Sequence, residues 1–137
     1  MTAPLKLHVL LVDDDDDTRE VVRLILESDG ISVTPAQDGL DALLRIEELR
    51  QHDPAAPYAI VLDYMMPRFS GAQFRERQLA NPAIASVPVI LVSAVSDLPS
   101  HAAALQPFAV LQKPIDPEEL TAVVREACES YLGRRIP

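Results

Sequence analysis

The chain has 137 residues, of which 48% are hydrophobic and 24% charged, and its formal net charge is −9. This size and balance are typical of one globular domain with one core. The negative charge argues against sequence-independent binding to nucleic acid, because such binding needs Lys and Arg to neutralise phosphates. No apolar run approaches the roughly 18 residues that a membrane span needs, and no signal-peptide pattern opens the chain, so we expect a cytoplasmic protein that does not enter a membrane.

Five short apolar runs alternate with helical patterns. The runs cover residues 7–12, 31–34, 58–62, 87–92 and 108–111. Four of them are nearly continuous rather than alternating, which indicates strands of a parallel sheet covered on both faces. The run at 31–34 is shorter and mixes apolar with polar residues, so we expect an edge strand there.

The first helix is expected to begin near Asp17, because Asp17 and Glu20 have the spacing of a capping box. Gly30 is its expected stop signal. A third helix is predicted over residues 70–80, with a weak apolar stripe. The pattern for a fourth helix, over residues 97–105, is the weakest in the chain.

The second and last helices have clearer patterns. In the second, Leu40, Leu43 and Leu44 have the i, i+3, i+4 spacing of one helical face. The last begins with Asp116, which can cap it, and Pro117, which suits a first turn. Its core-facing stripe is predicted to contain Leu120, Val123, Val124, Ala127 and Tyr131.

The order of strand then helix, five times over, predicts an α/β domain with a parallel sheet and helices on both faces. We expect one stand-alone domain over residues 1–137, with flexible ends at 1–5 and 134–137. Cys128 is the only cysteine, which excludes an internal disulfide, and its place on an apolar stripe predicts a small buried side chain rather than a reactive thiol.

Polar residues follow the strands of this sheet. The first strand ends in the acidic run Asp13 to Asp17, the third in Asp63, the fourth in Ser93-Ala94 and the fifth in Lys113-Pro114. Because active sites of such folds lie at the carboxyl ends of the strands, we expect these side chains to meet.

The chemistry of this set is specific. Clustered carboxylates repel one another, and a hard divalent cation such as Mg²⁺ relieves the repulsion. A carboxylate can act as a nucleophile toward phosphorus, while Lys113 and the hydroxyl of Ser93 can bind phosphoryl oxygens. The pattern therefore predicts a phosphoryl-transfer site that works by positioning and charge neutralisation.

Four segments resemble the receiver domains of two-component response regulators: HVLLVDDDDDTREVV, IVLDYMMPRFSG, VPVILVSA and LQKPI. The resemblance extends over about residues 6–133. It implies a flavodoxin-like (βα)5 fold, a doubly wound five-stranded parallel sheet with strand order 2-1-3-4-5.

The resemblance also assigns roles. Asp63 matches the phosphoacceptor, and Asp13 and Asp14 match the acid pair that holds Mg²⁺, with Mn²⁺ as an alternative ion. In this assignment Asp14 is the direct ligand and Asp13 acts through water. Asp63 itself and the backbone carbonyl of Met65 complete the protein ligands.

Further positions match the residues that surround the phosphoryl group. Ser93 matches the switch hydroxyl, Ala94 the small residue beside it, and Lys113 the lysine of the family's Lys-Pro segment. The resemblance also implies a cis bond before Pro114. The chain departs from the family at Val110, three residues before the lysine, where an aromatic residue is usual. This departure puts the usual aromatic readout of phosphorylation in doubt.

By this resemblance the chain is a response regulator in a two-component or phosphorelay pathway, a phosphoacceptor signalling protein rather than an enzyme. A sensor histidine kinase or histidine phosphotransfer protein would donate the phosphoryl group. With no output domain expected, a downstream protein or the chain's own dimer would respond to it.

Two other functions compete with this interpretation. One is a receiver-like interaction module that does not use phosphate, which only Val110 favours. The other is a small phosphatase of the haloacid dehalogenase type. The segment Asp14-x-Asp16-x-Thr18 resembles the nucleophile motif of that family. That function would leave Asp63 unexplained. It also expects further acidic metal ligands on a strand end beyond the lysine, where only Asp116 and the glutamates of the last helix follow Lys113.

Overall fold

The computed structural model describes residues 6–66, 68–94 and 105–135. Nearly all of the fourth predicted helix, residues 97–105, lies outside the described residues, as do both predicted flexible ends except residues 134 and 135. These two belong to the last helix, which runs to Arg135.

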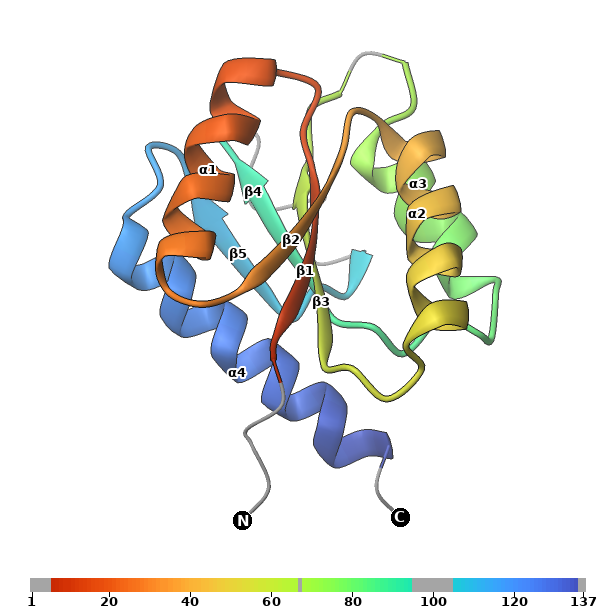
Figure 1. The fold of residues 1–137 in the computed structure, drawn as a ribbon. Helices are drawn as coiled ribbons and strands as arrows, with labels where there is room; N and C mark the ends of the chain where they lie inside the picture. The colour runs from red at the N-terminus through yellow and green to blue at the C-terminus, as the bar shows by residue number, and fades with distance from the viewer. Residues whose placement is uncertain (1–5, 67, 95–104, 136–137) are drawn as a thin grey trace, which may run out of the picture.

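Five parallel strands form one sheet in the order β2-β1-β3-β4-β5, which confirms the predicted fold class. The strands are β1 (His8–Val12), β2 (Ser32–Ala36), β3 (Tyr58–Asp63), β4 (Val89–Ser93) and β5 (Ala109–Gln112). Four helices are described: α1 (Asp16–Ser28), α2 (Gly39–His52), α3 (Gly71–Leu79) and α4 (Pro117–Arg135). Helices α1 and α4 cover one face of the sheet, and α2 and α3 cover the other (Figure 1).

Two hydrophobic clusters, one on each face, hold the layers together. Successive strand residues point to opposite faces, so Leu10 and Val12 pack with α2 and α3, while Val9 and Leu11 pack with α1 and α4. All six residues of β3 are buried. This burial on both faces is the reason why the central strands read as continuous apolar runs.

The edge position predicted for the second strand is confirmed, because β2 pairs only with β1 among the described strands. Pro35 lies within β2, opposite Leu11 of β1. A proline has no N–H to offer, so it weakens the free edge as a template for another strand.

The prediction that Asp17 caps α1 was wrong. The N-cap is Asp15, and Asp16 and Asp17 form the first turn. The backbone N–H of Asp15 donates to Asp13 Oδ1 at 2.9 Å, a turn that starts the helix two residues early. Glu20, the other half of the expected capping box, pairs with Arg23. Gly30 follows the helix with a φ of +80°, the left-handed conformation expected of a stop signal.

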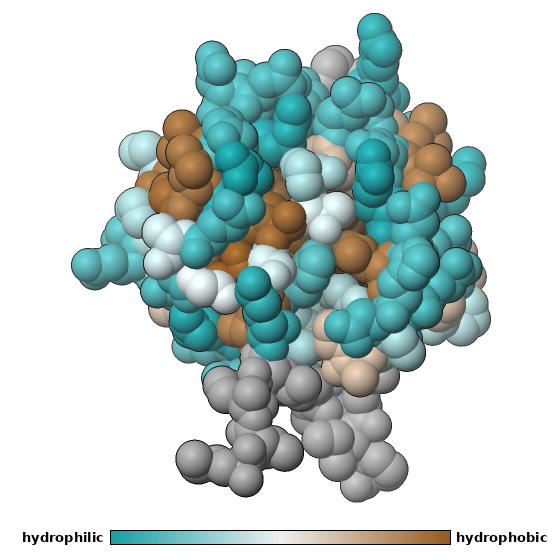
Figure 2. Space-filling model, viewed as in Figure 1, coloured by the Kyte–Doolittle hydropathy of each residue, from teal (hydrophilic) through white to brown (hydrophobic). Residues whose placement is uncertain are grey.

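The leucine pattern of α2 identified a helix but not its buried face. Leu40 and Leu44 are 55% and 62% exposed, whereas Ala42 and Ile46 are fully buried and Leu43 is partly buried. The face of α2 that packs on the core therefore carries Ala42 and Ile46, while Leu40 and Leu44 lie on the exposed side. Figure 2 shows the resulting hydrophobic patches over α1 and over α2 on an otherwise mainly hydrophilic face.

The remaining helices begin as their sequences predict. Ser70 caps α3 in a capping box with Gln73, and the Asp116 carboxylate accepts the N–H of Glu118 at 3.1 Å at the start of α4. The α4 stripe is confirmed, with Val123 partly buried and the others fully buried. Cys128 is buried as well, and burial raises the pKa of its thiol to about 12. No helix within the described ranges is long and apolar enough to cross a membrane.

The burial of α2 gives a direct test of its orientation. Replacing Ile46 by Ala should lower the free energy of unfolding by about 2–5 kcal/mol, because it leaves a cavity in the core. The matched change Leu44→Ala should alter it by only about 0.5 kcal/mol. Urea denaturation of both variants measures the difference, and equal losses would show that Leu44 is buried after all.

Candidate functional site

The carboxyl ends of four strands form the candidate site. Asp13 directly follows β1, and Asp63 and Ser93 are the last residues of β3 and β4. The register pairs Asp63 with Val92 of β4, and the N–H of Lys113 donates to the carbonyl of Ser93 at 2.9 Å. Backbone pairing alone therefore brings the predicted residues to one edge of the sheet.

Three carboxylates gather at this edge. Asp13, Asp14 and Asp63 each offer an oxygen, and these oxygens lie within 4.8 Å of one another. Asp13 and Asp63 are only 5% exposed, whereas Asp14 is exposed. Two buried acids and one exposed acid thus surround a point that solvent can reach.

Burial makes this cluster electrostatically costly. It raises the pKa of Asp63 to about 6, and the negative charge of Asp13 adds to the effect. The pKa of Asp13 is also raised, chiefly by burial. Lys113 opposes the rise at Asp63 with its Nζ 3.5 Å from Asp63 Oδ2, and so does the N–H of Met65, which donates to Asp63 Oδ1 at 3.2 Å.

A hard divalent cation fits this donor set. All three side chains offer oxygen, which Mg²⁺ prefers, and Mg²⁺ commonly takes one or two carboxylates together with waters. The raised pKa of Asp63 points the same way, because a cation would stabilise the ionised carboxylate.

The other predicted residues take separate places. Ser93 is 2% exposed, and its hydroxyl donates to the Ala94 carbonyl at 3.2 Å. The side chain of Lys113 is 37% exposed, and the Lys113–Pro114 bond is cis. Met65 is 60% exposed. Val110 is the second residue of the four-residue strand β5, and its side chain is partly buried against the core.

Gly71, the first residue of α3, packs against the backbone of the acceptor strand. A Cβ there would lie 3.1 Å from the Asp63 carbonyl oxygen and 3.1 Å from Tyr64 Cα. The N–H of Gly71 also donates to the Tyr64 carbonyl at 3.3 Å. A residue without a side chain therefore lets α3 support Asp63 from close by.

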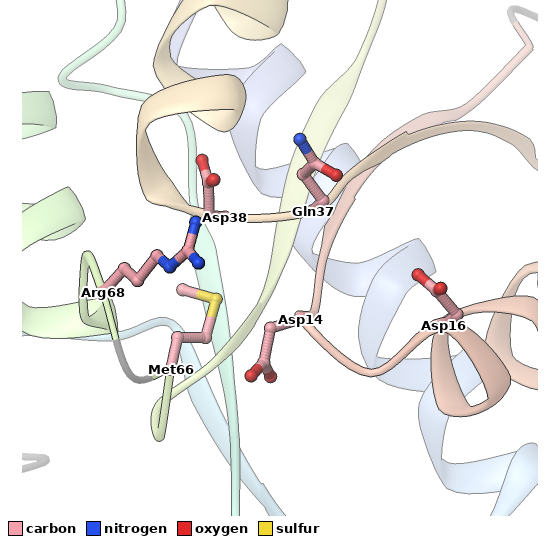
Figure 3. A pocket seen from close by; sticks show the side chains of 6 residues that line it. All are labelled: Asp14, Asp16, Gln37, Asp38, Met66 and Arg68. Carbon is pink, nitrogen blue, oxygen red and sulfur yellow. The ribbon is translucent and has the colours of Figure 1, made fainter.

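A pocket of about 360 Å³ opens beside Asp14, between the loop that follows β3 and the turn that leads into α2. Gln37 and Asp38 come from that turn, and Figure 3 shows Arg68 of the loop after β3 directed toward Asp38. The sequence reasoning missed Gln37 and Asp38, although their place after the second strand puts them at the same sheet edge. Of the three clustered acids, Asp14 thus lines this pocket.

Comparisons with known proteins agree with this geometry. The chain matches the response regulator receiver domain family over residues 9–125. An uncharacterized 14.6 kDa protein of Leptolyngbya boryana is 32% identical over 128 residues, which cover 92% of this chain and 93% of that protein. The response regulator MprA of Mycobacterium sp. (strain KMS) is 37% identical over 123 residues, 88% of this chain but only 50% of the relative.

A solved structure shows the same likeness. The chemotaxis protein CheY4 of Vibrio cholerae superposes with a TM-score of 0.78 at 25% identity, covering 89% of this chain and 98% of that one. The fold and the strand-end acids thus define a class of α/β signalling protein. The chain belongs to the response regulator receiver domain family and is a two-component response regulator.

The raised pKa of Asp63 predicts a pH-dependent stability. Protonated Asp63 favours the folded state, so its contribution is complete below its unfolded pKa of 3.8 and is lost as the pH rises through about 6. Without divalent cations, Asp63→Asn should therefore raise the free energy of unfolding at pH 7 by about 1–3 kcal/mol, and much less near pH 4.

Urea denaturation with a chelator, at pH 4 and at pH 7, measures this difference. The exposed Asp17 of the same acidic run provides the control Asp17→Asn. A gain from Asp63→Asn that is the same at both pH values would contradict the prediction.

Proposed function

We propose that Asp63 accepts a phosphoryl group from a phosphohistidine of a sensor histidine kinase or a histidine phosphotransfer protein, in a Mg²⁺-dependent reaction. Receiver domains as a family interact with such proteins and with downstream targets. The observation that carries the proposal is the position of Asp63: buried, beside two further carboxylates and 3.5 Å from the Lys113 ammonium. No other described carboxylate combines these features.

The reaction needs few groups from the protein. An oxygen of the ionised Asp63 carboxylate attacks phosphorus, the P–O bond forms, and the P–N bond of the donor breaks with its electron pair returning to the imidazole nitrogen. Hydrolysis reverses the modification: a water oxygen attacks phosphorus, and Asp63 leaves as a carboxylate. The chain's residues therefore mainly position the group and balance its charge.

Asp13, Asp14, Asp63 and the Met65 carbonyl are the groups proposed to hold Mg²⁺, or Mn²⁺ in its place. When bound, the ion supplies positive charge next to the phosphoryl oxygens. It would also favour the ionised form of Asp63, whose pKa burial raises to about 6. The nucleophile would then be charged throughout the neutral pH range.

Ser93 and Lys113 are proposed to bind phosphoryl oxygens, the first through its hydroxyl and the second through its ammonium. In the structure Lys113 pairs with Asp63, and the hydroxyl of Ser93 donates to the neighbouring carbonyl. Both contacts can be exchanged for contacts with a phosphoryl group. Ala94 is proposed to leave room for that group to enter.

This exchange would shift the protein between two states that differ in their binding of a downstream protein or of a second copy of the chain. The phosphatase alternative is not favoured. Asp16 lies in the first turn of α1 and pairs with Arg19, and the hydroxyl of Thr18 donates to Asp15. Two of the three residues of that motif thus serve the start of the helix.

Intact-protein mass spectrometry tests the phosphoacceptor directly. After incubation with a small acyl-phosphate donor and Mg²⁺, the wild type should gain one phosphoryl group, and Asp63→Asn should gain none. The control Asp17→Asn should react like the wild type, and a chelator should abolish the reaction. A gain that persists in Asp63→Asn would refute the assignment.

The lysine makes a second prediction. Lys113→Met removes the positive charge beside Asp63 Oδ2, so phosphoryl uptake at neutral pH should slow by about two orders of magnitude. Lys6, the other lysine of the chain, is exposed, which makes Lys6→Met a matched control. The same mass measurement, repeated over time, gives the rate of phosphoryl uptake by each variant. Equal rates for the two variants would exclude Lys113 from the reaction.

A further inference from the structure

The buried face of α3 carries two polar side chains in addition to Phe74. Arg75 is 6% exposed and Gln78 is fully buried. Arg75 Nε donates to the carbonyl of Leu105 at 2.8 Å and Nη2 to the carbonyl of Gln106 at 2.9 Å. Its Nη1 donates to Gln78 Oε1 at 2.8 Å. A planar guanidinium thus spans α3 and the segment that precedes β5.

Gln78 extends these contacts to the segment that precedes β4. Its Nε2 donates to the carbonyls of Ile84 and Val87, both at 2.9 Å. Two residues after Val87, β4 begins. We refer to Arg75, Gln78 and the four carbonyls that they bind as the α3 network. Because buried polar groups are costly when they lack partners, the six groups are strongly constrained to stay together.

The segment before β5 is held in an uncommon conformation. Gln106 has a φ of 51°, the left-handed region that residues other than glycine rarely adopt. Such a conformation persists where its surroundings enforce it. Arg75 binds the carbonyl of Gln106 itself and that of the residue before it. Phe108, two residues on, donates its N–H to Val89 at 2.8 Å and so joins β5 to β4.

The same helix touches the acceptor at its first residue. Gly71 packs against the backbone of Asp63 and Tyr64, and Arg75 lies four residues later. At a rise of about 1.5 Å per residue, the two contacts are about one helical turn apart. Helix α3 is therefore a short rigid connection between the backbone of the acceptor and the start of β5.

We propose that α3 couples the acceptor loop to residues 105–108 through Arg75 and Gln78, so that phosphorylation of Asp63 repositions the start of β5. This inference rests on the proposed function. It gives the chain a route to the fifth strand that does not need an aromatic side chain at Val110. When the loop around Asp63 moves, Gly71 moves with it, and the guanidinium carries the displacement to Leu105 and Gln106.

Hydrogen exchange measured by mass spectrometry tests the coupling on the full chain. With a small acyl-phosphate donor and Mg²⁺, amide exchange in residues 105–112 of the wild type should change at least twofold. In Arg75→Lys, which keeps the charge but loses the planar fork, that change should be largely lost while the phosphoryl mass gain remains. Arg77 is exposed on the same helix, so Arg77→Lys should respond like the wild type.

The double variant Arg75→Lys, Gln106→Gly separates coupling from mere support of the turn. Glycine adopts a positive φ freely, so it removes the need for Arg75 to hold Gln106. If the arginine only supports the turn, the exchange response will return in the double variant, and the proposal fails. If the arginine transmits the displacement, the response will stay lost.

Two further outcomes are decisive. An unchanged exchange pattern at residues 105–112 in a wild type that has gained the phosphoryl mass would overturn the coupling and leave the proposed function intact. No mass gain in the wild type would overturn the proposed function, and with it the coupling. The two failures are distinguishable because mass and exchange are measured on the same sample.

Discussion

The rest of the structure depends on one electrostatic constraint. Two adjacent strands of the parallel sheet bring buried carboxylates together at their carboxyl ends. Asp13 and Asp63 lie at the ends of neighbouring strands, and each is only 5% exposed. Burial raises the pKa of both carboxyls, and the negative charge of Asp13 adds to the rise in the pKa of Asp63. A stable fold would avoid such a pair, so its presence marks a site that is completed by positive charge.

The fold supplies part of the positive charge that these carboxylates need, and a bound cation would supply the rest. Lys113 reaches Asp63 from β5, at 3.5 Å and with its side chain 37% exposed. A pair of this length at the rim of the site constrains Lys113 weakly, which supports the proposal that its ammonium binds a phosphoryl oxygen. Gly71 holds the acceptor from the opposite direction through backbone contacts. The backbone of Asp63 is thus packed against α3, while the charge partner of its carboxylate can exchange.

The sequence predicts the strands and the site better than the helix details, for physical reasons. Continuous apolar runs mark strands buried on both faces, and the strand-end rule then assembles Asp13, Asp63 and Lys113 without further information. The start of α1 depends on a turn from Asp13 to Asp15, and the buried face of α2 depends on the packing of Ala42 against the core. Tertiary contacts of this kind leave little periodic signal in the chain.

The α3 network was equally invisible in the sequence, since Arg75 and Arg77 look alike there and only packing tells them apart. Its position bears on how a receiver can signal without the usual aromatic residue. A conformational change needs two states that the phosphoryl group distinguishes and a rigid element that both ends contact. Val110 has a smaller side chain than the usual aromatic residue, so a change in its rotamer would alter the surface less between the two states. The Arg75 guanidinium binds the carbonyls of Leu105 and of the left-handed Gln106, so in the proposed coupling a displacement of α3 reaches the start of β5 through these bonds.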